Sequence, residues 1–180
     1  MFEFIIKNKI KQHKEQDREK IFKNLENIKS IIVLFETNKY EYADAYVKKF
    51  QKMGKKVSGF GYRVNNDKLD YSKTPYYVID KKTDIDWKGL PTNKFYSLLD
   101  DIDCDAMIDL SINEHLFLEF MVAYVKAPLK IGLKKNELQL YDLAIAKSSE
   151  NIPEEVFPVN ELGEPIIFYL DSIQSTNKKQ

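Results

Sequence analysis

The sequence is poor in the residues on which metal and redox chemistry usually depend. Its 180 residues include one cysteine, Cys104, and two histidines, His13 and His115. A single cysteine excludes an intrachain disulfide and a cysteine metal cluster, and the two histidines lack the spacing of paired ligands. We therefore expect no metal and no cofactor. Cys104 begins an apolar run, so we interpret it as a buried, unreactive thiol, which fits a reducing compartment.

The sequence also lacks long apolar runs and any excess of charge. No segment approaches the roughly 20 apolar residues of a membrane span, and the apolar part of the first ten residues is shorter than the roughly 7–15 residues of a secretory signal core. The 28 Lys and Arg residues balance 28 Asp and Glu residues, so no overall field favours nucleic acid. We expect a cytoplasmic protein that binds no nucleic acid.

Motifs of common enzyme families are missing as well. The sequence contains no H-E-x-x-H, no G-x-S-x-G and no phosphate-binding loop with its lysine. No glycine-rich loop follows the first predicted strand, so dinucleotide binding is not expected. We therefore predict no catalytic residue.

Strand and helix patterns alternate from residue 30 onward. Short apolar runs predict strands at 30–35, 56–62, 76–80, 104–110, 129–133 and 141–146. Apolar stripes predict helices at 38–53, 92–102 and 114–127, followed by a last helix that begins at Pro165, although the run 166–170 could also form a strand. This alternation predicts an α/β fold with a single open, mostly parallel Rossmann-like sheet flanked by helices.

The chain divides into three predicted segments. Residues 1–28 form a basic amphipathic helix, residues 29–174 the Rossmann-like domain, and residues 175–180 a disordered tail. Because residues 11–20 contain no apolar side chain, we expect this part to be solvated and residues 1–20 to be removable without unfolding the rest. The helix could bind an unknown protein partner, a second copy of the chain or the domain itself, and peripheral contact with anionic lipid is a less favoured alternative.

The apolar runs and stripes also predict a hydrophobic core. Alanine at a central strand position such as Leu34 or Ile108 should cost about 2–5 kcal/mol. The predicted core residues are Ile32, Val33, Leu34, Val47, Phe50, Leu98, Met107, Ile108, Phe117, Met121 and Ile131.

Two polar loops are candidates for a ligand site. In open α/β sheets, ligands bind beyond the carboxyl ends of the strands, where the strand order reverses. If the order is 3-2-1-4-5-6, this point lies between the first and fourth strands. Two carboxylates there would repel an anion, so a hydroxyl-rich or cationic ligand suits the site better. The candidate residues are Glu36, Thr37, Asn38, Asp109, Ser111 and Asn113.

A purely structural interpretation of these loops competes with the ligand site. Asn38 with Glu41, and Ser111 with Glu114, have the spacing of a capping box, so Asn38 and Ser111 would begin helices. The acidic side chains would then be solvated or paired with cations, and no ligand would be found.

The segment IDCDAMIDLSINEHLFLEFMVAYVKAPLKIGL (residues 102–133) carries a resemblance to known proteins. Its strand ending in Asp-Leu, its buried helix and its Lys-Ile-Gly strand resemble an uncharacterised family of short bacterial α/β proteins, over most of residues 1–146. The segment is more distantly similar to the N-terminal half of heptosyltransferase-like glycosyltransferases (family 9, GT-B architecture). The matching positions there are Asp109-Leu110 and Ile131-Gly132.

The chain departs from the glycosyltransferase pattern in two ways. That family has a Gly-Asp pair after its first strand, where this chain has Tyr40 and Glu41. The second GT-B domain, which binds the sugar donor, has no counterpart in these 180 residues. The resemblance therefore implies the fold but not sugar transfer. We expect a non-catalytic binding or protein-interaction module, with a small-ligand-binding protein or an enzyme related to the acceptor half as the alternative.

Overall fold

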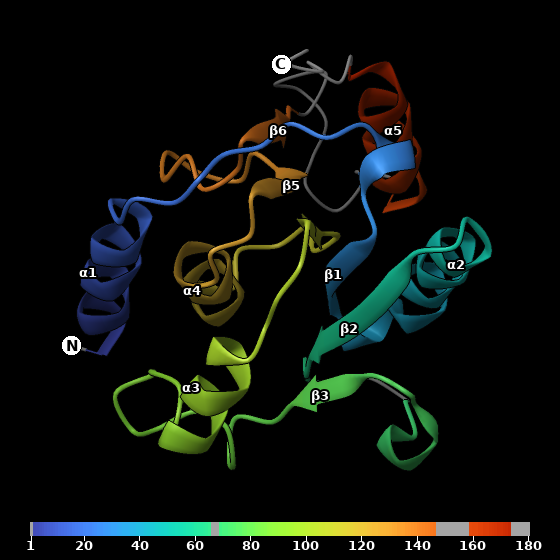
Figure 1. The fold of residues 1–180 in the computed structure, drawn as a ribbon. Helices are drawn as coiled ribbons and strands as arrows, with labels where there is room; N and C mark the ends of the chain where they lie inside the picture. Colours follow the sequence, from blue (N-terminus) through green and yellow to red (C-terminus); the bar gives the residue numbers. More distant parts are fainter. Residues whose placement is uncertain (1, 66–68, 147–158, 174–180) are drawn as a thin grey trace.

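The protein is built on a six-stranded parallel sheet with the order β3-β2-β1-β4-β5-β6. The structure, a computed structural model, describes residues 2–65, 69–146 and 159–173 (Figure 1). This sheet confirms the predicted open Rossmann-like fold and the strand order on which the candidate site depends. The strands are β1 (Ser30–Glu36), β2 (Lys56–Tyr62), β3 (Tyr77–Ile79), β4 (Ala106–Asp109), β5 (Leu129–Leu133) and β6 (Leu143–Ile145).

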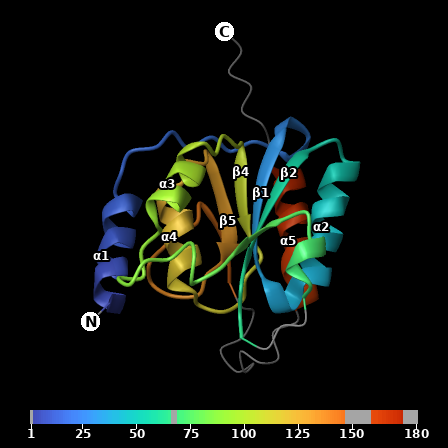
Figure 2. The same ribbon diagram turned by 90° about the horizontal axis from the view of Figure 1, so that it is seen from below.

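Helices cover both faces of the sheet, as Figure 2 shows. One face carries α1 (Phe2–Lys14), α3 (Asn93–Asp100) and α4 (Leu116–Tyr124), and the other carries α2 (Tyr40–Lys52) and α5 (Val159–Ser172). Within the described residues, short 3-10 turns lie at Leu25–Asn27, Thr37–Lys39 and Tyr71–Lys73.

The two faces bury two separate apolar cores. Alternate residues of β1 point to opposite faces, so Leu34 packs with the core under α4 while Val33 packs with the core under α2 and α5. Every predicted core residue is buried except Leu98, which is half-buried. The central strands are covered on both faces, and this explains their unbroken apolar runs.

The N-terminal segment differs from the predicted helix over residues 1–28, because α1 ends at Lys14. Beyond it the chain crosses the end of the sheet at which β5 begins. There the Arg18 guanidinium donates hydrogen bonds to both Asp142 carboxylate oxygens, at 2.5 and 2.6 Å, and to the carbonyl oxygens of Ala127 and Pro128. Ile10 is fully buried where α1 packs on α4. Most residues from 11 to 20 are exposed, so the prediction that this part is solvated is confirmed. The contacts of Ile10 and Arg18 nevertheless integrate the segment into the fold. The removal of residues 1–20 without unfolding stays a prediction.

The predicted helix starts also need correction. A 3-10 turn precedes α2, and no side chain caps that helix, so Asn38 does not act as the predicted cap. Helix α4 begins at Leu116 rather than 114, with no cap from Ser111, and ends at Tyr124, before Pro128.

The last helix and the tail complete the comparison. Helix α5 begins at Val159, so Pro165 lies inside it rather than at its start and removes one backbone hydrogen bond. The helix, rather than the alternative strand, is therefore correct for residues 166–170. The predicted disordered tail lies outside the described residues.

Candidate functional site

The carboxyl ends of β1 and β4 bring two buried acids to one edge of the sheet. Glu36 is the last residue of β1 and Asp109 the last of β4, and Leu34 pairs with Asp109 in the ladder. Their exposed fractions are 2% and 0%. Burying a charge is costly unless it is paired and hydrogen-bonded, so the partners of each acid decide what this edge does.

Glu36 is held by the loop that follows β4. Its Oε1 accepts hydrogen bonds from Asn113 Nδ2 at 2.8 Å and lies 2.7 Å from His115 Nε2, while its Oε2 accepts one from the Ile112 backbone N–H at 3.2 Å. Burial alone would raise the pKa of Glu36, but the hydrogen bonds from His115 and Asn113 lower it to about 2. The ring of Tyr62 packs on His115 from the end of β2. The carboxylate therefore ties the ends of β1 and β4 together.

Asp109 is held by three residues, Ser111, Lys135 and Tyr141. Its Oδ1 accepts from the backbone N–H of Ser111 at 2.8 Å and from the hydroxyl of Ser111 at 2.5 Å. Its Oδ2 accepts from Lys135 Nζ at 2.8 Å and from the Tyr141 hydroxyl at 2.6 Å. Burial, with the nearby Asp109 charge, raises the pKa of Tyr141 well above its ordinary value, so this hydroxyl remains a donor.

Ser111 and Lys135 combine residue types that form nucleophile and base pairs in some hydrolases. Lys135 Nζ donates to Ser111 Oγ at 2.6 Å. Ser111 is fully buried, however, so its hydroxyl is not open to a substrate from solvent, and the Lys135 side chain is only 4% exposed. The hydroxyl is also committed to Asp109. The arrangement is thus a buried, satisfied network of the kind that rigidifies a fold.

The structure brings together most of the predicted site residues. Glu36 contacts Asn113, and Asp109 contacts Ser111. Thr37 is buried and its hydroxyl accepts from the Val64 backbone N–H at 3.1 Å, which fixes the loop after β2. Asn38 is exposed and lines a separate depression beside α2.

Sequence reasoning missed four residues of this edge: His115, Glu119, Lys135 and Tyr141. His115 was considered only as a metal ligand, and it instead binds a carboxylate. Lys135 and Tyr141 flank the connection between β5 and β6, so their contact with Asp109 follows only from the strand order. For Lys135 a useful signal was its position just after a predicted strand, because polar side chains converge at the carboxyl ends of parallel strands. Tyr141 precedes β6, so this rule does not identify it.

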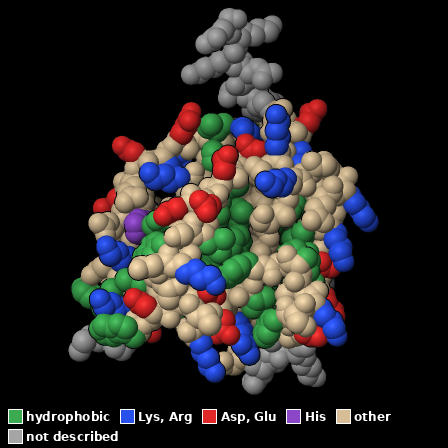
Figure 3. Space-filling view, turned by 60° about the horizontal axis from the view of Figure 1, so that its bottom comes forward, with side chains coloured by type: hydrophobic (Ala, Val, Ile, Leu, Met, Phe, Trp, Pro, Cys, Tyr) green, Lys and Arg blue, Asp and Glu red, His purple; other side chains and the backbone are tan. Residues whose placement is uncertain are grey.

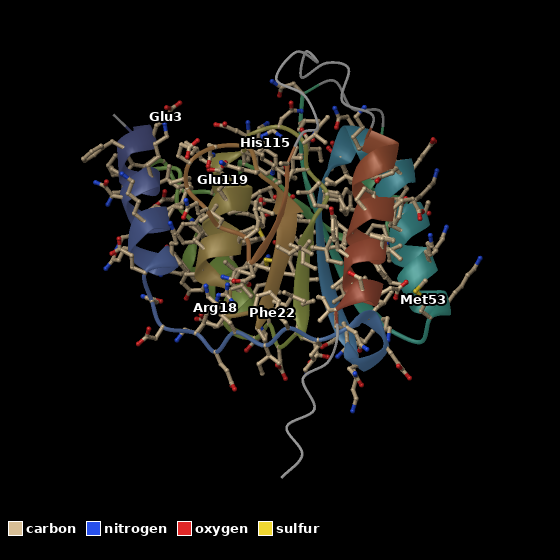
Figure 4. All side chains as sticks on the ribbon, turned by 90° about the horizontal axis from the view of Figure 1, so that it is seen from above. Glu3, Arg18, Phe22, Met53, His115 and Glu119 are labelled. Carbon is tan, nitrogen blue, oxygen red and sulfur yellow. The ribbon has the colours of Figure 1, made fainter. Side chains whose placement is uncertain are left out.

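A pocket of about 200 Å³ opens beside the Asp109 network. Its wall includes Glu119, which projects from α4 and is 2% exposed. Glu119 Oε1 accepts from Asn136 Nδ2 at 2.8 Å, but Oε2 has no hydrogen-bond partner among the described residues. Burial raises the pKa of Glu119. Figure 4 shows Glu119 and His115 near the same end of the sheet, opposite Arg18 and Phe22.

Two searches of the described residues complete the description of the site. No group of three or more His, Cys, Asp or Glu side chains in these parts of the chain is arranged to hold a metal ion. None of the described helices has the length and apolar character needed to cross a membrane.

A comparison with known families assigns the chain to one of them. A family model described as a family of unknown function, DUF6913, matches residues 3–157. The chain belongs to the DUF6913 family. This membership agrees with the resemblance to an uncharacterised family, and it assigns no activity. No curated protein and no solved structure matches this DUF6913 chain significantly, so the similarity to heptosyltransferases is not shown.

Proposed function

We propose that this DUF6913 protein is a non-catalytic binding domain. The observation that carries the proposal is that all four carboxylate oxygens of Glu36 and Asp109 are hydrogen-bonded to groups of the chain itself. In a catalytic edge, at least one acid or base must reach the reacting atoms. Here both acids instead join loops to strand ends, and this supports a structural role for them.

The protonation of these groups also supports the proposal. General acid–base catalysis works best when the pKa of the group lies near the operating pH. The pKa of Glu36 is lowered to about 2, so Glu36 is a weak base at neutral pH. Cys104 is buried, and its burial raises the pKa of its thiol to about 12, which disfavours the nucleophilic thiolate.

A screen that records both binding and turnover tests this function. Pure protein is melted with a panel of small metabolites, and each compound is then recovered and identified by mass spectrometry. The proposal expects compounds that raise the melting temperature, because ligands of the native state stabilise it by mass action, and that are recovered unchanged. A compound consumed in proportion to the wild-type protein, but not by Ser111→Ala, would contradict it.

A second candidate function is a protein contact through α1. The side of this helix that carries Ile6 and Ile10 packs toward α4 in the core, while Phe4 is 70% exposed. We propose that a partner protein or a second copy of the chain covers Phe4. Sedimentation of the wild type and Phe4→Ser tests self-association, with Met53→Ser on α2 as a control at another exposed apolar residue.

A lipid surface is the weaker alternative for α1. On the face drawn in Figure 3, acidic and basic side chains are interspersed, so that face offers no broad basic surface. Liposome flotation at low and high salt decides between lipid and protein, since absence from liposomes at both salts would end the lipid proposal.

We also propose that the fold is related to the acceptor half of GT-B glycosyltransferases. The support is that Asp109 and Gly132, which carry the resemblance, are paired neighbours on β4 and β5. Glu41, near the place of the missing catalytic aspartate, is exposed in the first turn of α2. Sugar transfer is therefore not part of the proposal. A cytoplasmic location is proposed too, because the single buried thiol fits a reducing compartment.

A further inference from the structure

Glu119 carries an unsatisfied oxygen in an otherwise satisfied edge of the sheet. Its side chain is 2% exposed, and Asn136 occupies only Oε1, at 2.8 Å. Within the described part of the chain, Oε2 has no hydrogen-bond partner. A buried polar atom without a partner costs free energy, and such atoms are rare in native proteins. This oxygen therefore points to a donor that is supplied from outside the chain.

The space next to Glu119 has the size and the lining for a small organic group. The pocket measures about 200 Å³ and lies between α4, the segment that follows β5, and β6. Leu140 and Ala144 provide apolar wall, together with the ring of Tyr141, whose hydroxyl is turned to Asp109. Polar side chains of Lys134, Lys135, Asn136 and Gln139 also line the pocket, although most of its accessible wall is apolar. A mostly apolar wall with a few placed polar groups is typical of small-molecule sites.

The charges around Glu119 favour a cation. Asp109 and Glu114 are the nearby acids, and Lys135 is the nearby base that acts on this carboxyl group. Lys135 is already hydrogen-bonded to Asp109 at 2.8 Å and to Ser111 at 2.6 Å. Lys134 also lines the pocket, but its side chain is exposed to solvent, where a charge is screened. The buried carboxyl group thus lacks a cation of its own.

We propose that this pocket binds a primary ammonium group carried on a short apolar chain, with the ammonium donating to Glu119 Oε2. The alkyl part would lie against Leu140 and Tyr141. The inference rests on the proposed function of binding without turnover, and it names the chemical class of the ligand. A charge-assisted hydrogen bond to a buried carboxylate is among the stronger polar interactions in proteins, and it would satisfy the remaining oxygen.

Calorimetric titration with n-butylammonium chloride tests the proposal. Two probes of similar shape, n-butanol and sodium butyrate, test whether the positive charge is required. We expect n-butylammonium to bind the wild type, and Glu119→Gln to weaken this binding by about tenfold or more. Glu114→Gln is the matched control, because Glu114 is an exposed acid near the same helix, and this variant should bind nearly as the wild type does.

A second variant covers the case in which Glu119→Gln does not fold. Ala144→Leu enlarges an exposed residue of the pocket wall without touching Glu119, and it should weaken n-butylammonium binding by steric exclusion. Absence of binding to the wild type, equal binding of n-butanol, or unchanged binding by both variants would each overturn the ammonium site. These results concern binding of n-butylammonium alone. The proposed function, binding without turnover, is contradicted by a different result, the consumption of a compound by the wild-type protein.

Discussion

The ring of Tyr141 packs directly against Gly132, and its hydroxyl donates a hydrogen bond to Asp109. A Cβ atom at residue 132 would lie 2.5 Å from Tyr141 Cε1, closer than such atoms approach in real structures. Gly132 pairs with Asp109 across β5 and β4, and the Tyr141 hydroxyl reaches Oδ2 of Asp109 at 2.6 Å. The glycine therefore permits a close approach that completes the buried network.

Gly132→Ala should destabilise the protein by about 1–3 kcal/mol, because the added methyl group must displace a buried ring. Urea unfolding measures the loss. In the background of Tyr141→Leu, which removes the ring, the same substitution should cost much less, since the two effects are coupled. Equal costs in both backgrounds would show that the ring is not the cause.

Glu36 should make stability depend on pH in the acid range. Its pKa is lowered from 4.5 to about 2 in the folded protein, so its contribution is fully present above pH 4.5 and is lost as the pH falls toward 2. The full contribution is on the order of 3 kcal/mol. The stability advantage of the wild type over Glu36→Gln should therefore shrink as the pH falls from about 4.5 toward 2 in urea unfolding. An advantage that stays constant would contradict the assigned pairing.

Lys130 should make stability rise with pH as well, but in the neutral to alkaline range. Its Nζ is buried and donates to the carbonyl oxygens of Val122 and Ala123 near the end of α4. Burial, with the Arg18 charge, lowers the pKa of Lys130 from 10.5 to about 7. Between these values the unfolded chain binds more protons than the folded chain, so wild-type stability should rise with pH relative to Lys130→Met. Parallel pH profiles would show that Lys130 stays charged in the fold.

Residues 1–20 should prove necessary for full stability. Ile10 is fully buried between α1 and α4, so Ile10→Ala should cost about 2–5 kcal/mol. Phe4→Ala changes an exposed side chain of the same helix, and it should stay within about 0.5 kcal/mol. Deletion of residues 1–20 should lower the melting temperature by more than either variant. An unchanged melting temperature after deletion would contradict this expectation and confirm the sequence-based prediction that residues 1–20 are removable.

The fold was accessible from the sequence because its central strands are covered on both faces. Apolar runs such as 31–35 and 106–108 are typical of such strands, and the helix stripes between them imply parallel crossovers. The ends of the helices were harder to predict. Residues Asn38 and Ser111 have capping spacing, yet Ser111 is committed to Asp109, which no local pattern reveals.

The sequence predicted where the candidate site lies, but not which groups its acidic side chains contact. The positions of Glu36 and Asp109 at neighbouring strand ends follow from strand order alone. Their partners Lys135 and Tyr141 lie 26 and 32 residues from Asp109 in sequence, and a satisfied network is visible only in three dimensions. The contacts of the N-terminal segment could not be predicted either, because Arg18 binds Asp142, which lies 124 residues away in the sequence.

The unfolding free energy of Asp109→Asn tests the central claim most directly. The claim is that the acids at the strand ends hold the fold together and are not free to serve a substrate. Asparagine removes the charge that Lys135 pairs with and leaves a buried ammonium uncompensated, so urea unfolding should show a loss of about 3–5 kcal/mol. Asp109→Asn combined with Lys135→Met should recover part of this loss. An unchanged or increased stability of Asp109→Asn, as expected for an acid with a catalytic rather than a structural role, would contradict the account.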